Sequence, residues 1–229
     1  MRFQDAARDA RAIVYAGIQA DPLVARTAAL LAAATPSQRL LARAVMNGET
    51  TSADAWRRMF PALFGQTARR AEAIADRSEE ILEASLAVAL KGEQVRSQYR
   101  GAIVEALTAI LLGRRLPPDA IRKERRVLFD GVGANIHPYD VTAELPERAE
   151  VYDCKWGARG INPEVLLQLA SARQHAADEG VRLTAALVVF DARLSCQVRL
   201  ARLPPMTGVS LVTIETLDAL AGVRPKPPA

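Results

Sequence analysis

Two acidic residues and a lysine near the middle of the chain have the types and spacing that could cut a phosphodiester bond. The segment HPYDVTAELPERAEVYDCKW, residues 137–156, places Asp140 on one strand-like run and Asp153 and Lys155 on the next. Pro146 and Glu147 between the runs form a natural two-residue turn, since Pro favours the second position of a turn. A hairpin centred there places Asp140 directly opposite Asp153.

The alternation of side chains along a strand then separates a charged face from an apolar one. Asp140, Asp153 and Lys155 share the charged face. Facing carboxylates repel each other unless a cation neutralises them, and oxygen ligands of this kind suit Mg²⁺, for which Mn²⁺ can substitute. We therefore expect Asp140 and Asp153 to bind metal and Lys155 to orient or deprotonate the attacking water. The alternative is a solvated charged hairpin face. The apolar face holds Tyr139, Val141, Ala143, Tyr152, Cys154 and Trp156.

The sequence Pro-Tyr-Asp at 138–140, followed by Asp-Cys-Lys at 153–155, resembles the PD-(D/E)xK nuclease superfamily, which has the restriction-endonuclease-like fold. The resemblance covers roughly residues 96–220. It implies that Glu105, on the leading helix, contributes to catalysis and to a second metal or a metal-bound water. It also implies a catalytic role for Gln168, on the helix after the hairpin.

The resemblance further implies that the backbone carbonyl of Cys154, between acid and lysine, binds the metal. The chain departs from the family in two respects. Ala172 stands where some branches carry Tyr four residues after the Gln, and the second acid is Asp rather than the commoner Glu. From the residues alone, Glu105 could instead line the back of its helix, and Gln168 could be a surface or core amide.

Hydrophobic periodicity divides the chain into a helical half and a half with mixed elements. Residues 1–95 have apolar residues at helical spacing, with helix-start signals at Asp21-Pro22, Thr35-Pro36 and TSAD, residues 51–54. The second half predicts helices at 96–115 and 162–178, strands at 124–129, 135–144, 149–156 and 183–191, and a final strand and helix within 209–222. This order predicts an α/β (α+β) fold preceded by an all-helical module. The resemblance implies that the α/β part is a restriction-endonuclease-like core with a central mixed sheet flanked by helices.

Three segments follow from this division. Residues 1–95 are expected to form a helical module for dimerisation, regulation or target binding, and residues 96–222 the nuclease-like domain. Residues 223–229 are expected to be a flexible tail. A homodimer through the helical module is expected by family analogy, because one active site per chain cuts one strand.

The charge of the chain favours an acidic partner. Its formal net charge is +4, and most of the basic excess lies in the second half. Nucleic acid is therefore the expected partner, DNA rather than RNA, although a solvated charged loop is the alternative for the basic segment around 122–126. The residues expected to contact phosphates are Arg100, Arg122, Lys123, Arg125, Arg126 and Arg159.

The chain is expected to be cytoplasmic and not membrane-bound. Asp5 and Asp9 oppose a targeting peptide, and the longest apolar stretch, about 13 residues interrupted by Arg26, is too short to cross a bilayer. Its two cysteines exclude a disulfide framework and a zinc site. The expected function is a Mg²⁺-dependent DNA endonuclease of restriction, defence or mobile-element type. Alternatives are an RNA-directed nuclease, a non-catalytic nucleic-acid- or protein-binding module, and a helical interaction protein with an inert second half.

Overall fold

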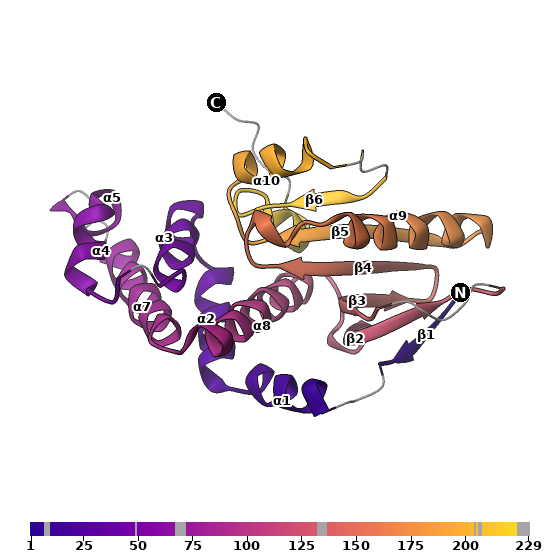
Figure 1. Cartoon of the computed structure of the whole chain (residues 1–229), viewed down its shortest axis with the longest axis horizontal. Coiled ribbons are helices and arrows are strands. Elements are labelled where there is room, and N and C mark those ends of the chain that lie inside the picture. The colour runs from indigo at the N-terminus through magenta and orange to yellow at the C-terminus, as the bar shows by residue number, and fades with distance from the viewer. Residues whose placement is uncertain are drawn as a thin grey trace. The chain divides into compact units, whose positions relative to one another are not determined.

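The chain has a mixed α/β fold, as predicted, with a six-stranded mixed sheet and flanking helices in the part that the structure describes (Figure 1). A computed structural model describes residues 1–6, 10–48, 50–66, 72–131, 137–203, 205 and 208–223. The chain divides into a helical unit, Ala10–Leu107, and a sheet unit, Met1–Asp9 with Thr108–Ala229.

The boundary between the units differs from the predicted one in two ways. It falls inside helix α8 (Glu93–Leu112) rather than at residue 96, and Arg2–Asp5 form strand β1 of the sheet rather than part of a helix. Phe3 of β1 pairs with Val127 and packs against the sheet core, so a contact distant in sequence decides the conformation of this segment. The predicted tail beyond Val223 lies outside the described residues.

Helix-start signals place the helices of the helical unit where the sequence predicts. Asp21 accepts a hydrogen bond from Leu23 N at 2.8 Å, Thr35 forms a capping box with Gln38, and Ser52 caps the fourth helix. These caps satisfy amide groups that a helix start leaves without partners. The helices are α1 (Ala10–Gln19), α2 (Pro22–Ala32), α3 (Pro36–Met46), α4 (Ala53–Met59), α5 (Pro61–Phe64), α7 (Glu72–Ala89) and the first three-quarters of α8.

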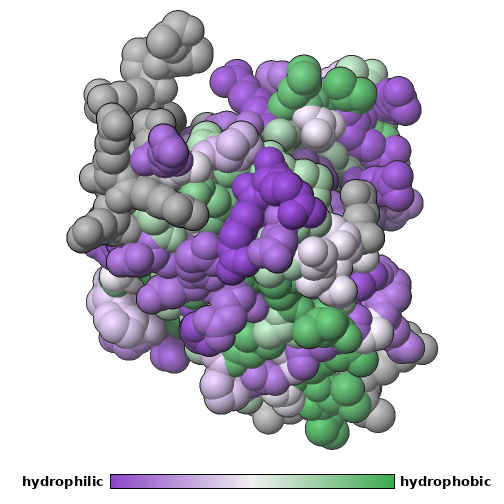
Figure 2. All heavy atoms as spheres, turned by 90° about the vertical axis from the view of Figure 1, so that its left-hand side faces the viewer, coloured by the Kyte–Doolittle hydropathy of each residue, from purple (hydrophilic) through white to green (hydrophobic). Residues whose placement is uncertain are grey.

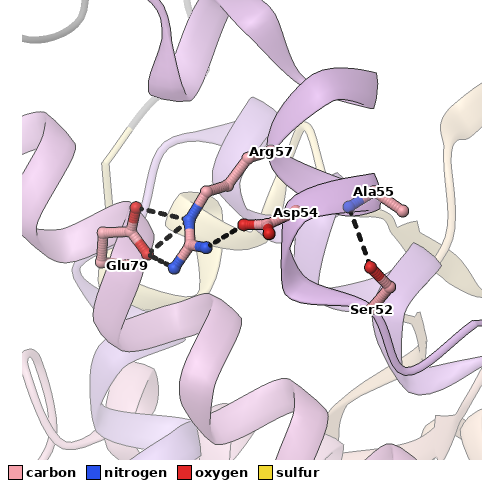
Figure 3. Close-up of polar contacts among 5 residues, drawn as sticks. All are labelled: Ser52, Asp54, Ala55, Arg57 and Glu79. Carbon is pink, nitrogen blue, oxygen red and sulfur yellow. Dashed lines mark hydrogen bonds and ion pairs between the residues drawn. The ribbon is translucent and has the colours of Figure 1, made fainter.

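An arginine joins α4 to α7 (Figure 3). Arg57 of α4 lies 2.9 Å from Glu79 of α7 and 2.8 Å from Asp54 one turn earlier in its own helix. Hydrogen bonds from the guanidinium to Glu79 and then Asp54 raise the pKa of Arg57. Because all three side chains are substantially exposed, this cluster orients α4 more than it stabilises the unit.

The exposed glycine in the interior of α1 provides a test of helix propensity. Gly17 has no atom within 4 Å of the position that a Cβ would occupy, and its backbone is helical. We expect Gly17→Ala to raise the free energy of unfolding by about 0.5–1 kcal/mol, because alanine loses less backbone entropy in a helix. Chemical denaturation would measure this change, and a destabilised variant would contradict the assigned extent of α1.

Exposed apolar side chains do not single out one dimerisation surface. Figure 2 shows hydrophobic residues in more than one patch among hydrophilic ones on the face that it presents. In the helical unit the most exposed large apolar residues belong to different elements, among them Ile13 and Val14 on α1, Met59 on α4 and Leu90 after α7. Dimerisation through this module therefore stays a prediction.

The sheet unit is built on strands in the order β1-β2-β3-β4-β5-β6. Neighbours from β1 to β4 are antiparallel, whereas β4–β5 and β5–β6 are parallel. Helix α9 (Pro163–Asp178), which Asn162 caps, makes the crossover from β4 to β5. The strands are β1 (Arg2–Asp5), β2 (Ile121–Leu128), β3 (Tyr139–Leu145), β4 (Arg148–Lys155), β5 (Arg182–Val189) and β6 (Ser210–Val212).

The core between α9 and the sheet fixes the faces of the central strands. Leu166 and Leu169 of α9 are buried in one cluster with Val151 of β4 and Leu187 of β5. The alternate residues of β4 are buried as well, so both faces of this strand are covered. Short elements complete the unit: 3₁₀ helices η1 (Pro118–Ala120), η2 (Ala158–Gly160) and η3 (Leu217–Ala221), and helix α10 (Arg193–Leu200).

In the part of the chain that the structure describes, every helix is too short or too polar to traverse a bilayer.

Candidate functional site

The predicted hairpin and its register are confirmed. Val141 pairs with Tyr152 and Leu145 with Arg148 across the turn at 146–147, which is the predicted centre. The regular ladder ends at the pair Val141 and Tyr152, one step before Asp140 and Asp153. There the Asp140 Oδ2 atom accepts a hydrogen bond from Cys154 N at 2.6 Å.

The hairpin nevertheless differs from the prediction in its faces. The alternative of a solvated charged face does not describe Asp153, which is only 9% exposed because α9 and the neighbouring strands cover this end of β4. Tyr139 was expected on the side of Val141. It lies instead in the core on the α9 side, where its hydroxyl donates to Gln168 O at 3.4 Å. The strict alternation used in the prediction therefore fails at the start of β3.

The two acids and the lysine come together at the carboxyl end of β4. The Lys155 Nζ atom lies 2.5 Å from Asp153 Oδ1, and these side chains are 26% and 12% exposed. Since Lys155 pairs with Val189 in the parallel ladder, this end of β4 lies beside the carboxyl end of β5. The structure thus gathers Asp140, Asp153 and Lys155 as the sequence predicts, in a half-buried position.

Burial and charge act in opposite directions on each member of the pair, and the pKa of both groups is raised. Burial raises the pKa of the Asp153 carboxyl, and Lys155 and His137 only partly offset this effect. Burial opposes the charge of Lys155, but the carboxylates of Asp153 and Asp140 outweigh it and raise the pKa of Lys155. Lys155 therefore carries its positive charge at neutral pH.

Gly160 in η2 leaves room for the side chain of Lys155. A Cβ atom at Gly160 would lie 3.0 Å from Lys155 Cβ and 3.2 Å from Lys155 Cδ. These contacts are tighter than ordinary van der Waals separation, so the absence of a side chain at 160 leaves the space in which Lys155 extends.

This close approach gives a prediction. We expect Gly160→Ala to lower the free energy of unfolding by about 1 kcal/mol, because overpacking displaces the Lys155 stem. Gly92→Ala is the matched control, because a Cβ there meets no atom within 4 Å. Equal denaturation midpoints for Gly160→Ala and Gly92→Ala would show that Lys155 does not depend on Gly160.

The carbonyl of Cys154 has a direction that is compatible with the implied metal role. A residue in a strand presents its N–H and C=O groups to the same neighbouring strand. The Cys154 N–H group faces Asp140 of β3, so its carbonyl is directed to that side as well. The thiol lies on the face opposite α9, 3.5 Å from the hydroxyl of Thr108.

Gln168 lies near the acids but its side chain is engaged elsewhere. Its Nε2 atom donates to His137 O at 2.8 Å, so the amide links α9 to the segment that leads into β3. This contact positions the backbone two residues before Tyr139, the neighbour of Asp140. A direct catalytic role for Gln168 stays a prediction.

Glu105 belongs to the helical unit and is 4% exposed. Its carboxylate accepts hydrogen bonds from Tyr15 Oη at 2.5 Å and Gln19 Nε2 at 2.7 Å, both from α1. The structure therefore gives this acid local partners within its own unit. Its assignment to a second metal stays a prediction.

The basic residues expected to contact phosphates separate into three groups. Arg100 pairs with Glu93 at 2.9 Å, and Arg125 pairs with Glu144 at 2.8 Å and also with Asp5. These arginines are held by carboxylates of the chain itself. Arg126 is half-buried, and its Nε atom has no hydrogen-bond partner among the described residues. The exposed members of the set are Arg122, Lys123 and Arg159.

The basic segment is also not a loop. Strand β2 covers 121–128, whereas the sequence placed its start near 124. Regular pairing with β3 and β1 holds Arg122, Lys123 and Arg125 in an extended strand. The alternative of a solvated loop is therefore wrong, and the phosphate contacts of these residues stay a prediction.

The sequence did not single out Asp191, an aspartate at the carboxyl ends of β4 and β5, beside the acids and the lysine. Asp191, 3% exposed and just after β5, accepts hydrogen bonds from Ala158 N at 2.8 Å and Ala192 N at 2.7 Å. Because Ala158 begins η2, this carboxylate fixes the turn that contains Gly160. An acid directly after the buried run LVVF was the available sequence signal.

A second unpredicted network lies on the opposite face of β4. Arg115 donates to Glu150 Oε1 at 2.9 Å, to Tyr152 Oη at 3.2 Å and to Leu220 O at 2.7 Å. Glu150 is 6% exposed. Burial favours its protonated form, but Arg115 and Tyr152 outweigh burial and hold the pKa of Glu150 below its ordinary 4.5.

The donor set at the carboxyl end of β4 fits a hard divalent cation only in part. Asp153 Oδ1 is buried and pairs with Lys155 Nζ at 2.5 Å, so a divalent cation would share this carboxylate with the ammonium. No cluster of three or more His, Cys, Asp or Glu side chains suited to a metal occurs within the described ranges. Two carboxylates and a carbonyl match Mg²⁺, which completes its coordination with water and substrate oxygens.

Comparisons with known proteins give the fold little context. No family model matches the chain, and no curated protein matches it. Among solved structures it is similar to protein VC1899 from Vibrio cholerae, with a TM-score of 0.48 and 17% identity. The similarity covers 88% of this chain and 55% of that one, so the chain spans about half the length of that structure.

Proposed function

We propose that the chain is a Mg²⁺-dependent nuclease that hydrolyses phosphodiester bonds, with DNA as its substrate. The observation that supports this most directly is the grouping of Asp140, Asp153 and Lys155 at the carboxyl end of β4. Two acids and a cation at one strand end are the groups that metal-assisted phosphodiester hydrolysis requires. They also match the acid, acid and lysine of the PD-(D/E)xK pattern.

The roles follow from chemistry. Asp140, Asp153 and the Cys154 carbonyl would hold the cation, for which Mn²⁺ would substitute. When bound, the cation would supply a nucleophilic hydroxide at neutral pH and neutralise charge on the phosphate. Lys155, as an ammonium, would donate hydrogen bonds to a phosphate oxygen and to the attacking water. Its charge balances the added negative charge of the substrate.

The substrate would approach along exposed basic side chains. Arg122, Lys123 and Arg159 are accessible to phosphates, whereas Arg100 and Arg125 would first have to leave their carboxylates. Contacts to phosphates position a nucleic acid without reading its sequence. We extend the proposal to endonuclease activity in the cytoplasm, of restriction, defence or mobile-element type, with the helical unit for dimerisation or target binding.

A second candidate is a binding module that retains the fold without the chemistry. It is favoured by the internal pairing of both acids, because Asp140 binds Cys154 N and Asp153 binds Lys155. A site already satisfied by its own chain has less need of a metal. This reading predicts binding of nucleic acid or protein in EDTA, with no cleavage.

The test is cleavage of supercoiled plasmid, single-stranded DNA and RNA by the purified protein in Mg²⁺, Mn²⁺ or EDTA. Nicking or linearisation of plasmid that EDTA abolishes is the expected result. If the protein cleaves RNA but neither DNA substrate, the substrate is RNA instead of DNA. If no substrate is cleaved in either metal while the protein still binds nucleic acid or protein in EDTA, the chain is a binding module.

A further inference from the structure

A cavity of about 690 Å³ opens at the amino-terminal ends of β4 and β5, beside the second half of α9. Three arginines line it: Arg148 at the start of β4, Arg173 on α9 and Arg182 at the start of β5. No Asp or Glu occurs among its described lining residues. The cavity therefore combines a concave surface with a concentrated positive charge.

The register of the sheet places two of these cations side by side. Arg148 pairs with Arg182 in the parallel ladder, so their side chains leave the sheet on the same face. Like charges at paired positions destabilise a sheet unless an anion lies between them. Arg182 is 3.2 Å from Glu147, but both side chains are largely exposed and this pairing contributes little. Arg148 also acts electrostatically on the nearby Glu150, but that carboxylate is held by hydrogen bonds from Arg115.

The guanidinium of the third arginine, Arg173, packs against the backbone of Gly208. A Cβ atom at Gly208 would lie 1.6 Å from Arg173 Nη1 and 2.6 Å from its Cζ atom. The guanidinium thus occupies the space that a side chain at 208 would take, and it extends from α9 toward the segment before β6. This contact limits the directions that Arg173 can take.

Apolar residues form another part of the lining. Ala170 and Ala177 of α9, with Val181 and Leu183 at the start of β5, contribute to the cavity, and Ser171 and Thr184 add hydroxyl groups. Arginine forks bind phosphate oxygens in pairs, whereas an apolar wall with a few hydroxyls suits a planar base and a sugar. The volume is that of a typical small-molecule site.

We propose that this cavity binds a nucleotide that carries two or more phosphates, with the arginines on the phosphates and the apolar wall against the nucleoside. The site is separate from the acids of β4. Asp153 is five residues beyond Arg148 on the same strand, which corresponds to roughly 17 Å at the rise of a β-strand. The inference therefore does not rest on nuclease activity.

The test is titration calorimetry of the full chain with ATP, inorganic triphosphate and a 12-nucleotide single-stranded DNA, all in EDTA. We expect saturable binding of ATP that becomes about 10-fold weaker or more in each of Arg148→Gln, Arg173→Gln and Arg182→Gln. Arg193→Gln is the matched control, because it removes an exposed arginine outside the cavity. Circular dichroism would verify that the variants remain folded.

Further measurements distinguish this site from the proposed active site, and nucleotide binding from the binding of other anions. ATP affinity should be unchanged in Asp153→Asn, whether or not the wild type cleaves nucleic acid. The proposal is overturned if ATP does not bind, or if all four arginine variants bind it equally well. It is also overturned if inorganic triphosphate binds as tightly as ATP, or if the oligonucleotide binds more tightly and loses affinity in the same three variants.

Discussion

Replacing Asp140 with asparagine is expected to lower Mg²⁺-dependent cleavage at least ~100-fold while it leaves the stability of the sheet almost unchanged. The amide oxygen of asparagine can still accept the hydrogen bond from Cys154 N, which is 2.6 Å from Asp140 Oδ2. Only the negative charge toward the cation is lost. Cleavage rates and denaturation midpoints of the same preparations measure the two effects separately.

Asp153→Asn is expected to lose activity to the same extent, although it also leaves Lys155 without its closest carboxylate. Asp119→Asn is the control, since Asp119 is exposed on η1. A rise in melting temperature with Mn²⁺ that the Asp140→Asn/Asp153→Asn double variant lacks would report the metal site without activity. Undiminished cleavage by both single variants would refute the assignment of these acids.

The second large effect is expected at Arg115, whose guanidinium pairs with the buried Glu150 carboxylate. Arg115→Met should lower the free energy of unfolding by about 3 kcal/mol at neutral pH, because it leaves the Glu150 carboxylate buried without its cation. The Arg115→Met/Glu150→Leu double variant should recover most of this loss, since it buries no unpaired charge. Urea denaturation of the two variants and the wild type measures the difference.

The effect of Arg115 should depend on pH with a definite sign. Because the pKa of Glu150 is lowered in the folded state, its contribution to stability is complete above about pH 4.5 and is lost as the pH falls through the folded value. The difference between wild type and Arg115→Met should therefore shrink below that pH. A difference that is constant down to the acid transition would show that Glu150 is not the group responsible.

The hairpin was predictable from sequence because its information is local. A proline turn fixes the centre, and alternation fixes the faces from Val141 to the turn, so the register of Val141 with Tyr152 follows without tertiary contacts. The burial of Asp153 was not predictable in this way. It depends on α9 and β5, which follow the hairpin in sequence and cover it in space.

Contacts between distant segments explain the other differences. Four residues at 2–5 carry no periodic signal, and only pairing with β2 makes them a strand. Arg125 was read as a phosphate ligand because its partners Glu144 and Asp5 lie on other strands. Glu105 was recognised as an acid on an apolar helix, but the donors Tyr15 and Gln19 come from α1.

Strand β1 also has a consequence for the biogenesis of the protein. It pairs with β2 across more than a hundred residues, and the whole helical unit is synthesised between the two strands. At roughly 5–20 residues per second, β1 waits on the order of 6–25 s on the ribosome for its partner. Its docking is therefore a late step of folding with a large loop to close. An edge strand that docks late is also one that two nascent chains can exchange, which would join them as a swapped dimer without any new interface.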